Sequence, residues 1–340
     1  SAVLCTVLNL CKAGDSLVAV SAIYGGVINL LSVTLNRLGI ECIWVAPDSS
    51  EEVLRNAIKD NTKLVFGETI ANPALRVLDL ELFAKVAHEK QIPLVVDSTF
   101  ATPILCKPIE WGADIVIHST TKYMDGHAVQ MGGVIVDSGK FDWIASPQFP
   151  DFVTPDESYH GVVYTRDFGA MAFIIKARMQ LMRDFGCYQT PQGAFLLNLG
   201  LETLALRMER YSQNALEVAQ HLKKSSKIES VSYPGLPSDI DYPLTQKYLK
   251  KGASGVITFV IKGGRAAAVR FMDAMKVASR VVHVADIRTC VLHPASSTHR
   301  QLTDQQLLAA GINPGMIRFS CGLEHISDII EDIDQALEKV

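Results

Sequence analysis

A lysine, an aspartate and several hydroxyl side chains stand where apolar stretches of this sequence end. Lys122 and its neighbours Ser119 and Thr121 follow the apolar stretch 114–118, and Asp97 ends another. In open parallel sheets, ligands bind beyond the carboxyl ends of the strands. A lysine at this edge could form a Schiff base with a carbonyl-bearing cofactor. The spacing therefore indicates one ligand site that is assembled from several strand ends.

The types of these side chains suit a phosphorylated pyridine ring. A carboxylate such as Asp97 keeps a ring nitrogen protonated, so that the ring can withdraw electrons from a carbanion. Tyr24 offers a flat face for stacking, and Ser119 and Thr121 offer hydroxyls to phosphate oxygens. Each residue also has an ordinary alternative, because lysines are usually solvated and because Asp and Tyr are common in caps and turns. Since four successive strands deliver compatible groups to one edge, we favour the ligand site.

The elements that must position these residues alternate between strands and helices. We expect strands at 16–21, 42–46, 64–68, 93–97, 114–118 and 133–136, and helices at 2–12, 26–38, 51–59 and 80–89. Stretches 94–96 and 115–117 are uniformly apolar, which is typical of strands covered by helices on both faces. The sequence therefore predicts an α/β fold with a mostly parallel sheet.

The pattern changes after about residue 140. Residues 141–164 are rich in Pro, Phe and Asp and are expected to form an irregular surface excursion. We expect helices at 168–183, 193–224, 265–275 and 326–339, and strands at 255–261, 281–284, 291–293 and 317–320. At roughly 150 residues per domain, the 340 residues suggest two domains. We predict a large domain at 1–165, linking helices at 166–224 and a smaller α+β domain at 225–340.

The composition excludes several classes of protein. The chain is 48% hydrophobic and 20% charged, with a net charge of −4, which rules out a disordered chain. No block of basic residues indicates nucleic acid or a membrane surface, and no apolar run approaches the ~20 residues of a membrane span. The 7 cysteines are scattered, so neither a metal site nor a disulfide framework is expected, and a cytoplasmic location fits best. Dinucleotide and P-loop fingerprints are missing.

Several stretches resemble one known family in order along the chain. They are residues 24–26, 68–73, 97–103, 119–123, 200–204, 293–296 and 317–324. With them the chain resembles the pyridoxal-phosphate enzymes of cysteine and methionine metabolism, which include the trans-sulfuration enzymes. The resemblance implies a fold of the aspartate-aminotransferase type (fold type I), pyridoxal 5′-phosphate as cofactor, and a homotetramer built from two dimers.

The resemblance also assigns roles to individual positions. Lys122 would be the Schiff-base lysine, and we count it and Tyr24 as candidate catalytic residues. Asp97 would face the ring nitrogen and Tyr24 would stack on the ring. Ser119 and Thr121 would hold the phosphate. Two further assignments are Asn72, which would approach the ring hydroxyl, and Arg318, which would bind the substrate α-carboxylate in a bidentate pair.

Within this family the chain is most similar to the sulfhydrylase branch that acts on O-acetylhomoserine. Segments 155–161, 206–210 and 297–302 are typical of that branch, and Gly26 stands where methionine γ-lyases have a cysteine. Val282 and His283 replace a Glu-Ser pair of the cystathionine enzymes, which leaves the role of His283 open. The branch implies γ-replacement by sulfide or a thiol to give homocysteine and acetate. The alternatives are γ-elimination from methionine or cystathionine, and a cofactor-binding protein without useful catalysis.

The N-terminal end of the sequence differs from the pattern of the family. Family members have several dozen residues before this point, including a Tyr-x-Arg motif that reaches the partner subunit's phosphate. Because the sequence opens with Ser1 and runs directly into an apolar stretch, we expect the natural chain to be longer.

Overall fold

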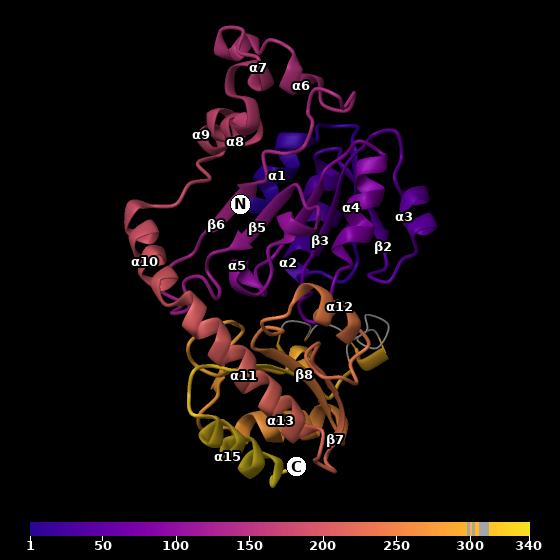
Figure 1. The fold of residues 1–340 in the computed structure, drawn as a ribbon. Coiled ribbons are helices and arrows are strands. Elements are labelled where there is room, and N and C mark those ends of the chain that lie inside the picture. Colours follow the sequence, from indigo (N-terminus) through magenta and orange to yellow (C-terminus); the bar gives the residue numbers. More distant parts are fainter. Residues whose placement is uncertain (298–299, 301–302, 306–312) are drawn as a thin grey trace. The chain divides into compact units, whose positions relative to one another are not determined.

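The computed structural model describes residues 1–297, 300, 303–305 and 313–340. The chain forms two compact units (Figure 1). The first contains residues 1–72, 76–120 and 131–195, and the second contains residues 73–75, 121–130 and 196–340. The domain bounds at residues 165 and 224 remain a prediction from the sequence. Part of the branch-typical segment 297–302 (residues 298, 299, 301 and 302) lies outside the described residues.

A six-stranded sheet forms the centre of the first unit. Its strands are β1 (Ser16–Val20), β2 (Glu41–Val45), β3 (Thr62–Glu68), β4 (Leu94–Asp97), β5 (Ile115–Ser119) and β6 (Gly133–Asp137). The strand order is β2-β1-β3-β4-β5-β6, and only β6 runs antiparallel to its neighbour. The parallel strands therefore end at one edge of the sheet, as predicted, with Glu68, Asp97 and Ser119 as their last residues.

Helices pack against this sheet (Figure 1). The helices of the first unit are α1 (Ala2–Leu10), α2 (Gly25–Asn29), α3 (Glu51–Ala57), α4 (Leu80–Glu89), α5 (Thr102–Leu105), α6 (Pro150–Val153), α7 (Tyr164–Phe168), α8 (Ala172–Ala177) and α9 (Arg183–Phe185). α4 contacts β3 and β4, and α1 contacts β5 and β6. Asp79 precedes α4 as its N-cap, and its carboxylate accepts a hydrogen bond from the Leu82 N–H. The predicted helix 26–38 contains a π-helical turn from Leu30 to Leu35 after α2.

The predictions for residues 141–183 were partly wrong. Residues 141–164 include a buried aromatic cluster instead of forming only a surface excursion: the Trp143 ring stacks on Phe152 at 4.4 Å and on Phe173 at 5.7 Å between centroids. Burial of these large aromatic rings stabilises this segment. The predicted helix 168–183 begins later, at Ala172, because Gly169 has a φ of 55° that ends α7, and a π-helical turn (Arg178–Met182) joins α8 to α9.

The second unit contains a five-stranded, mostly antiparallel sheet. Its strands are β7 (Ile228–Ser232), β8 (Val256–Ile261), β9 (Ser279–Arg280), β10 (Cys290–Leu292) and β11 (Met316–Ser320), in the order β7-β8-β11-β10-β9. α10 (Pro191–Glu202) leads into this unit, which also has α11 (Leu204–Leu222), α12 (Tyr242–Tyr248), α13 (Gly264–Ala274) and α15 (Ile326–Leu337). The predicted helix 193–224 is thus two helices, since Thr203 leaves helical geometry. The smaller α+β part is as predicted.

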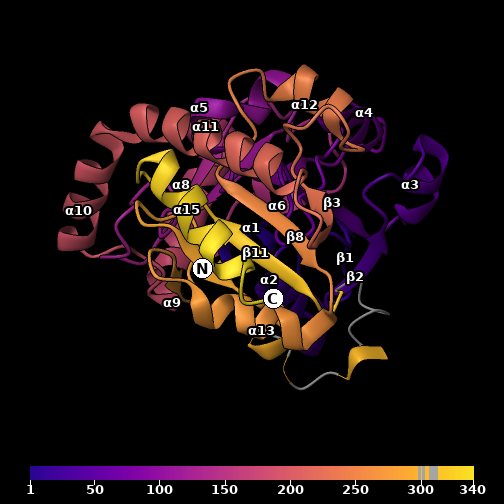
Figure 2. The same ribbon diagram turned by 90° about the horizontal axis from the view of Figure 1, so that it is seen from below.

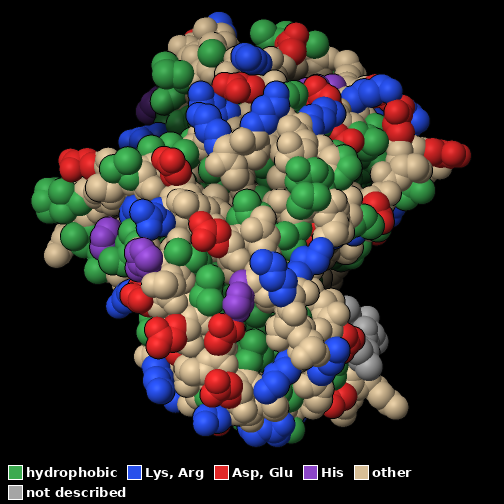
Figure 3. Space-filling model, turned by 60° about the horizontal axis from the view of Figure 1, so that its bottom comes forward, with side chains coloured by type: hydrophobic (Ala, Val, Ile, Leu, Met, Phe, Trp, Pro, Cys, Tyr) green, Lys and Arg blue, Asp and Glu red, His purple; other side chains and the backbone are tan. Residues whose placement is uncertain are grey.

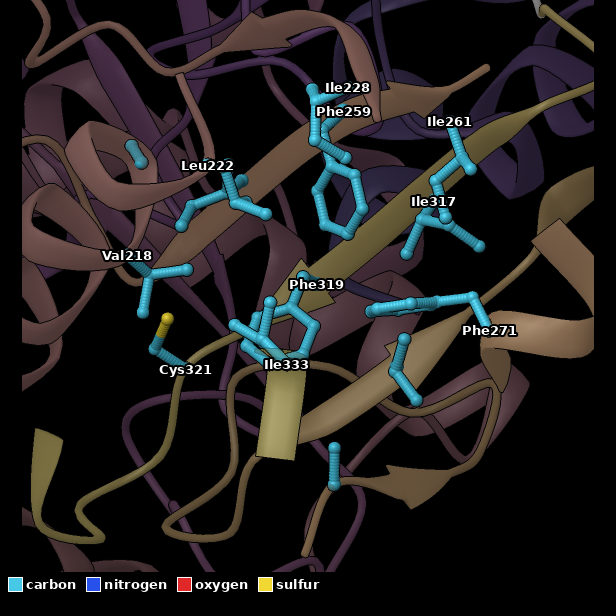
Figure 4. Packing of buried hydrophobic residues seen from close by; sticks show 14 of the residues in the cluster. Val218, Leu222, Ile228, Phe259, Ile261, Phe271, Ile317, Phe319, Cys321 and Ile333 are labelled. Atoms are coloured by element: carbon cyan, nitrogen blue, oxygen red, sulfur yellow. The ribbon is translucent and has the colours of Figure 1, made fainter. Parts of the chain in front are cut away.

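Three helices cover one face of this sheet. α11 contacts β7 and β8, α13 contacts β8 and β11, and α15 packs on both helices (Figure 2). The core between these layers contains Val218, Leu222, Phe259, Phe271, Phe319 and Ile333 (Figure 4). The strand predicted at 281–284 was wrong, because the ladder ends at Arg280 and the following residues have irregular backbone.

The charged side chains of both signs are interspersed on the face shown in Figure 3. No helix of the described residues has the length and apolar character needed to cross a membrane. Within the same residues no group of three or more His, Cys, Asp or Glu side chains could hold a metal ion.

Candidate active site

Asp97 and Ser119 are linked by one threonine at the carboxyl edge of the first unit's sheet. Asp97 ends β4, and its Oδ1 accepts hydrogen bonds from Thr99 N at 2.9 Å and from Thr99 Oγ1 at 2.5 Å. Thr99 Oγ1 in turn accepts a hydrogen bond from Ser119 N at 2.8 Å, at the end of β5. These contacts fix the orientation of the Asp97 carboxylate, while burial raises its pKa to about 6.

Glu68 is a buried carboxylate whose role the sequence analysis missed. Its Oε1 accepts a hydrogen bond from Tyr24 N at 2.8 Å, and its Oε2 accepts one from Asn72 N at 3.2 Å. It therefore holds two of the predicted cofactor residues in place. Burial and the neighbouring charge of Asp97 raise the pKa of Glu68 well above its ordinary value. The signal in the sequence was a charged residue that ends an otherwise apolar strand.

Tyr24 stands at the start of α2 with its side chain 53% exposed. A Cβ atom at Gly26 would lie 2.5 Å from Tyr24 Cε1, so the ring occupies space that only glycine leaves free. The absence of a side chain at residue 26 thus permits the observed position of the Tyr24 ring. This gives a physical reason for the glycine that the sequence analysis noted.

Lys122 lies in the second unit on a loop that is held by α11. Arg207 donates hydrogen bonds to Tyr123 O at 2.7 Å and to Met124 O at 3.3 Å, and its side chain is buried. The loop turns at Gly126, whose φ is 74° and whose N–H donates to Lys122 O at 2.8 Å. A Cβ at Gly126 would lie 2.3 Å from Arg207 Nη1. Sequence reasoning gave Arg207 no positioning role, because nothing in its helical pattern marks a buried arginine.

The charge of one basic side chain acts on another in the second unit. Burial, and then the charge of Arg318, lower the pKa of Lys122. Arg318 is on β11, is nearly buried, and donates a hydrogen bond from Nη2 to Val282 O at 2.7 Å. Both effects act against the charged form of the Lys122 amine, and an anion that binds Arg318 would offset the repulsion between the two groups.

The structure thus groups the predicted residues in two sets. Within the first unit, Tyr24 and Asn72 share Glu68, and Asp97 and Ser119 share Thr99. Within the second unit, the charges of Lys122 and Arg318 interact. Thr121 precedes Lys122 on its loop, and its contact with phosphate remains a prediction.

The carboxylates of the first unit fit a protonated pyridine ring. Glu68 and Asp97 repel one another, and neither forms an ion pair with a lysine, arginine or histidine among the described residues. A cation placed against Asp97 would stabilise its charged form, and a protonated ring nitrogen is such a cation. The donor set therefore suits the cofactor that the sequence analysis predicted.

Comparisons with known proteins identify relatives of this chain. The chain is 48% identical to the homocysteine synthase of Schizosaccharomyces pombe over 340 residues, which covers 99% of this chain and 79% of that protein. It is 43% identical to the O-acetyl-L-homoserine sulfhydrylase of Leptospira meyeri, covering 100% and 78% of the two chains.

A solved structure shares the fold. A crystal structure described as an O-acetylhomoserine (thiol)-lyase from Campylobacter jejuni superposes with a TM-score of 0.94 at 36% identity, covering 99% of this chain and 80% of that one. That protein carries an N′-pyridoxyl-lysine-5′-monophosphate. The family model for the Cys/Met metabolism PLP-dependent enzymes matches residues 1–338. The predicted family is therefore confirmed, and the chain belongs to the Cys/Met metabolism PLP-dependent enzymes.

Proposed function

We propose that this protein catalyses a γ-replacement on O-acetyl-L-homoserine, with sulfide or a small thiol as the incoming nucleophile. The Cγ–O bond breaks and acetate leaves with its electron pair, while a C–S bond forms at the same carbon. With hydrogen sulfide the products are L-homocysteine, acetate and one proton. The enzyme is thus an aminocarboxypropyl transferase. Support comes from the names and high identity of the relatives and from the arrangement of Lys122 and Arg318.

The first unit supplies groups that would hold the cofactor. Asp97 would keep a proton on the ring nitrogen, and Tyr24 would cover a face of the ring. Asn72 would approach the ring hydroxyl, and Ser119 would hold phosphate together with Thr121. Bound pyridoxal phosphate supplies an electron-withdrawing ring that stabilises negative charge next to the substrate nitrogen. Glu68 and Thr99 orient these groups through the hydrogen bonds described above.

The second unit supplies the groups that would act on the substrate. Arg318 would bind the α-carboxylate, because a guanidinium presents paired donors to a carboxylate. Lys122 Nζ would remove and return protons on the substrate carbons, which requires the neutral amine. Burial and the charge of Arg318 lower the pKa of Lys122, which acts in the direction of the neutral amine. The observation that carries the proposal is the identity of 48% and 43% to relatives named homocysteine synthase and O-acetyl-L-homoserine sulfhydrylase.

The test is a product assay with and without sulfide. We expect homocysteine and acetate in equal amounts from O-acetylhomoserine and sulfide. Lys122→Ala should abolish this turnover, whereas Lys140→Ala, at an exposed lysine, should leave it unchanged. Release of 2-oxobutyrate from methionine or cystathionine at the higher rate, independent of sulfide, would contradict the proposal in favour of γ-elimination.

The assembly and location are also proposals. We infer a homotetramer from the family resemblance, which native mass spectrometry would test. The 7 cysteines are all unpaired, and this supports a reducing compartment such as the cytoplasm.

A further inference from the structure

A cavity of about 210 Å³ lies in the first unit, at the edge of the sheet where the parallel strands begin. Lys12 and Asp15 line it shortly before β1, and Lys63 lines it at the start of β3. The end of α1, residues 147–152 and Lys176 of α8 form the rest of its wall. The predicted cofactor residues follow the opposite ends of the parallel strands. The cavity is therefore separate from the candidate active site.

Lys176 is a buried cation in the wall of this cavity. The residue is 7% exposed, and its Nζ donates hydrogen bonds to Asn9 O at 3.3 Å and to Asn9 Oδ1 at 3.4 Å. Both bonds are long, and an ammonium group carries three donors. No carboxylate of the described residues forms an ion pair with Lys176. Lys176 is thus a buried charge without a counter-ion from this part of the chain.

Neighbouring side chains hold the ammonium group in place without neutralising it. Asn9 Nδ2 donates to Phe173 O at 3.0 Å, which fixes Asn9 Oδ1 toward Lys176. The Phe152 ring centroid lies 5.2 Å from Lys176 Nζ, and this ring stacks on Trp143. Neutral acceptors and ring faces offset only part of the free energy that burying a charge costs. The geometry therefore leaves room for an anion at a cation whose position is fixed.

The other charged residues around the cavity do not supply this anion. Lys63 Nζ lies 3.7 Å from Asp15 Oδ1, so these two charges neutralise one another. Asp151 is exposed, and with Asp156 it acts on Lys176 only from beyond ion-pair distance. Burial lowers the pKa of Lys176, and the two aspartates oppose this effect. A single negative charge at Nζ would stabilise the charged form further.

We propose that this cavity binds a small monocarboxylate, whose oxygens accept from Lys176 Nζ and whose apolar part lies against Phe149 and Phe152. Pockets for drug-sized ligands measure roughly 300 to 1,000 Å³. A cavity of about 210 Å³ therefore suits an anion of few non-hydrogen atoms. A phosphate dianion would bring a second charge that no unpaired buried cation of the wall offsets. The site is independent of the proposed function.

The test is the binding of sodium propionate to the full chain loaded with pyridoxal phosphate, measured by saturation-transfer NMR. The compared proteins are the wild type, Lys176→Met and Asn9→Asp. Lys176→Met removes the cation. Asn9→Asp keeps the lysine and places a carboxylate at the acceptor position 3.4 Å from Nζ, so that the chain supplies its own counter-ion. The control is Lys140→Met, at an exposed lysine of the same unit.

The wild type should bind propionate with a dissociation constant on the order of 1 mM. The affinity should be at least tenfold weaker in Lys176→Met and in Asn9→Asp, and unchanged in Lys140→Met. Because Asn9→Asp retains the lysine, it tests the proposal even if Lys176→Met does not fold. Wild-type affinity in either folded variant overturns the proposal, and binding at Arg318 alone would give that result. Phosphate or n-propylammonium that binds as tightly as propionate would also overturn it.

A second measurement locates the bound anion. Lysines are reductively methylated with and without propionate at constant ionic strength, and the products are mapped by mass spectrometry. Propionate should slow the methylation of Lys176 several-fold, because the anion occupies the cavity and stabilises the charged amine, but should leave Lys140 unaffected. A rate at Lys176 that propionate does not change would contradict the proposed site. Neither measurement uses turnover, so failure of the proposed function leaves both results standing.

Discussion

Replacing Asp97 by asparagine should stabilise the cofactor-free protein and yet weaken its hold on the cofactor. Asparagine keeps the oxygen that accepts from Thr99 N and Oγ1. It removes a buried charge that has no cationic partner among the described residues. The same change relieves Glu68, whose pKa is raised partly by Asp97.

The magnitude follows from the pKa of Asp97, which burial raises from 3.8 to about 6. Because the folded state binds this proton more tightly than the unfolded chain, folding stability falls as the pH rises from about 4 through about 6. At 1.36 kcal/mol per unit the full loss is about 3 kcal/mol, and partial exposure of the side chain reduces it to about 1 to 3 kcal/mol. Asp97→Asn should remove this loss and raise the midpoint of thermal unfolding at neutral pH by roughly 1 to 4 °C.

The assay is thermal unfolding of cofactor-free protein between pH 4 and pH 8, followed by cofactor titration. Losing a charge-assisted hydrogen bond should weaken pyridoxal phosphate binding by about 10- to 100-fold. Asp137→Asn is the matched control, because burial also raises the pKa of Asp137. Asp137 lies opposite Ile115 in the strand register, at the other end of β5 from Ser119. That variant should leave cofactor binding unchanged. If Asp97→Asn is no more stable than the wild type at pH 8, or binds the cofactor equally well, the reasoning is refuted.

Two further predictions concern residues that position the site. Gly26→Ala should displace the Tyr24 ring, because the added Cβ would lie 2.5 Å from Tyr24 Cε1. Cofactor binding should weaken by roughly tenfold. If the cofactor quenches tyrosine fluorescence in this variant as it does in the wild type, the prediction is wrong. Arg207→Lys should lower the free energy of unfolding by about 2 to 4 kcal/mol and reduce kcat, because lysine lacks the paired donors that bind both loop carbonyls. Arg210→Lys, on the exposed face of α11, should change neither the free energy of unfolding nor kcat. Equal unfolding curves for the two variants would contradict the role of Arg207.

The strand ends could be predicted because they depend on local pattern. Uniformly apolar stretches indicated parallel strands, and Asp97 and Ser119 indeed end β4 and β5. The residues that follow in the sequence were then enough to predict a cofactor site. The individual roles of these side chains remain predictions that the experiments above address.

The residues that were missed depend on contacts distant in sequence. Glu68 accepts from Tyr24, which is 44 residues away, and Arg207 donates to Tyr123, which is 84 residues away. No local pattern marks either pairing. The strand predicted at 281–284 failed for the same reason, because Arg318 takes the carbonyl of Val282 and Ser320 takes the N–H of Ala285. The backbone of this apolar segment is therefore hydrogen-bonded to the side chains of Arg318 and Ser320 instead of to a neighbouring strand.

Lys122 is the residue that we propose binds the cofactor and moves protons. The most direct test is borohydride reduction of the protein loaded with pyridoxal phosphate, followed by peptide mapping. We predict loss of the visible absorption band and a pyridoxyl group on Lys122 alone. A pyridoxyl group on another lysine, with Lys122 unmodified, would contradict the account.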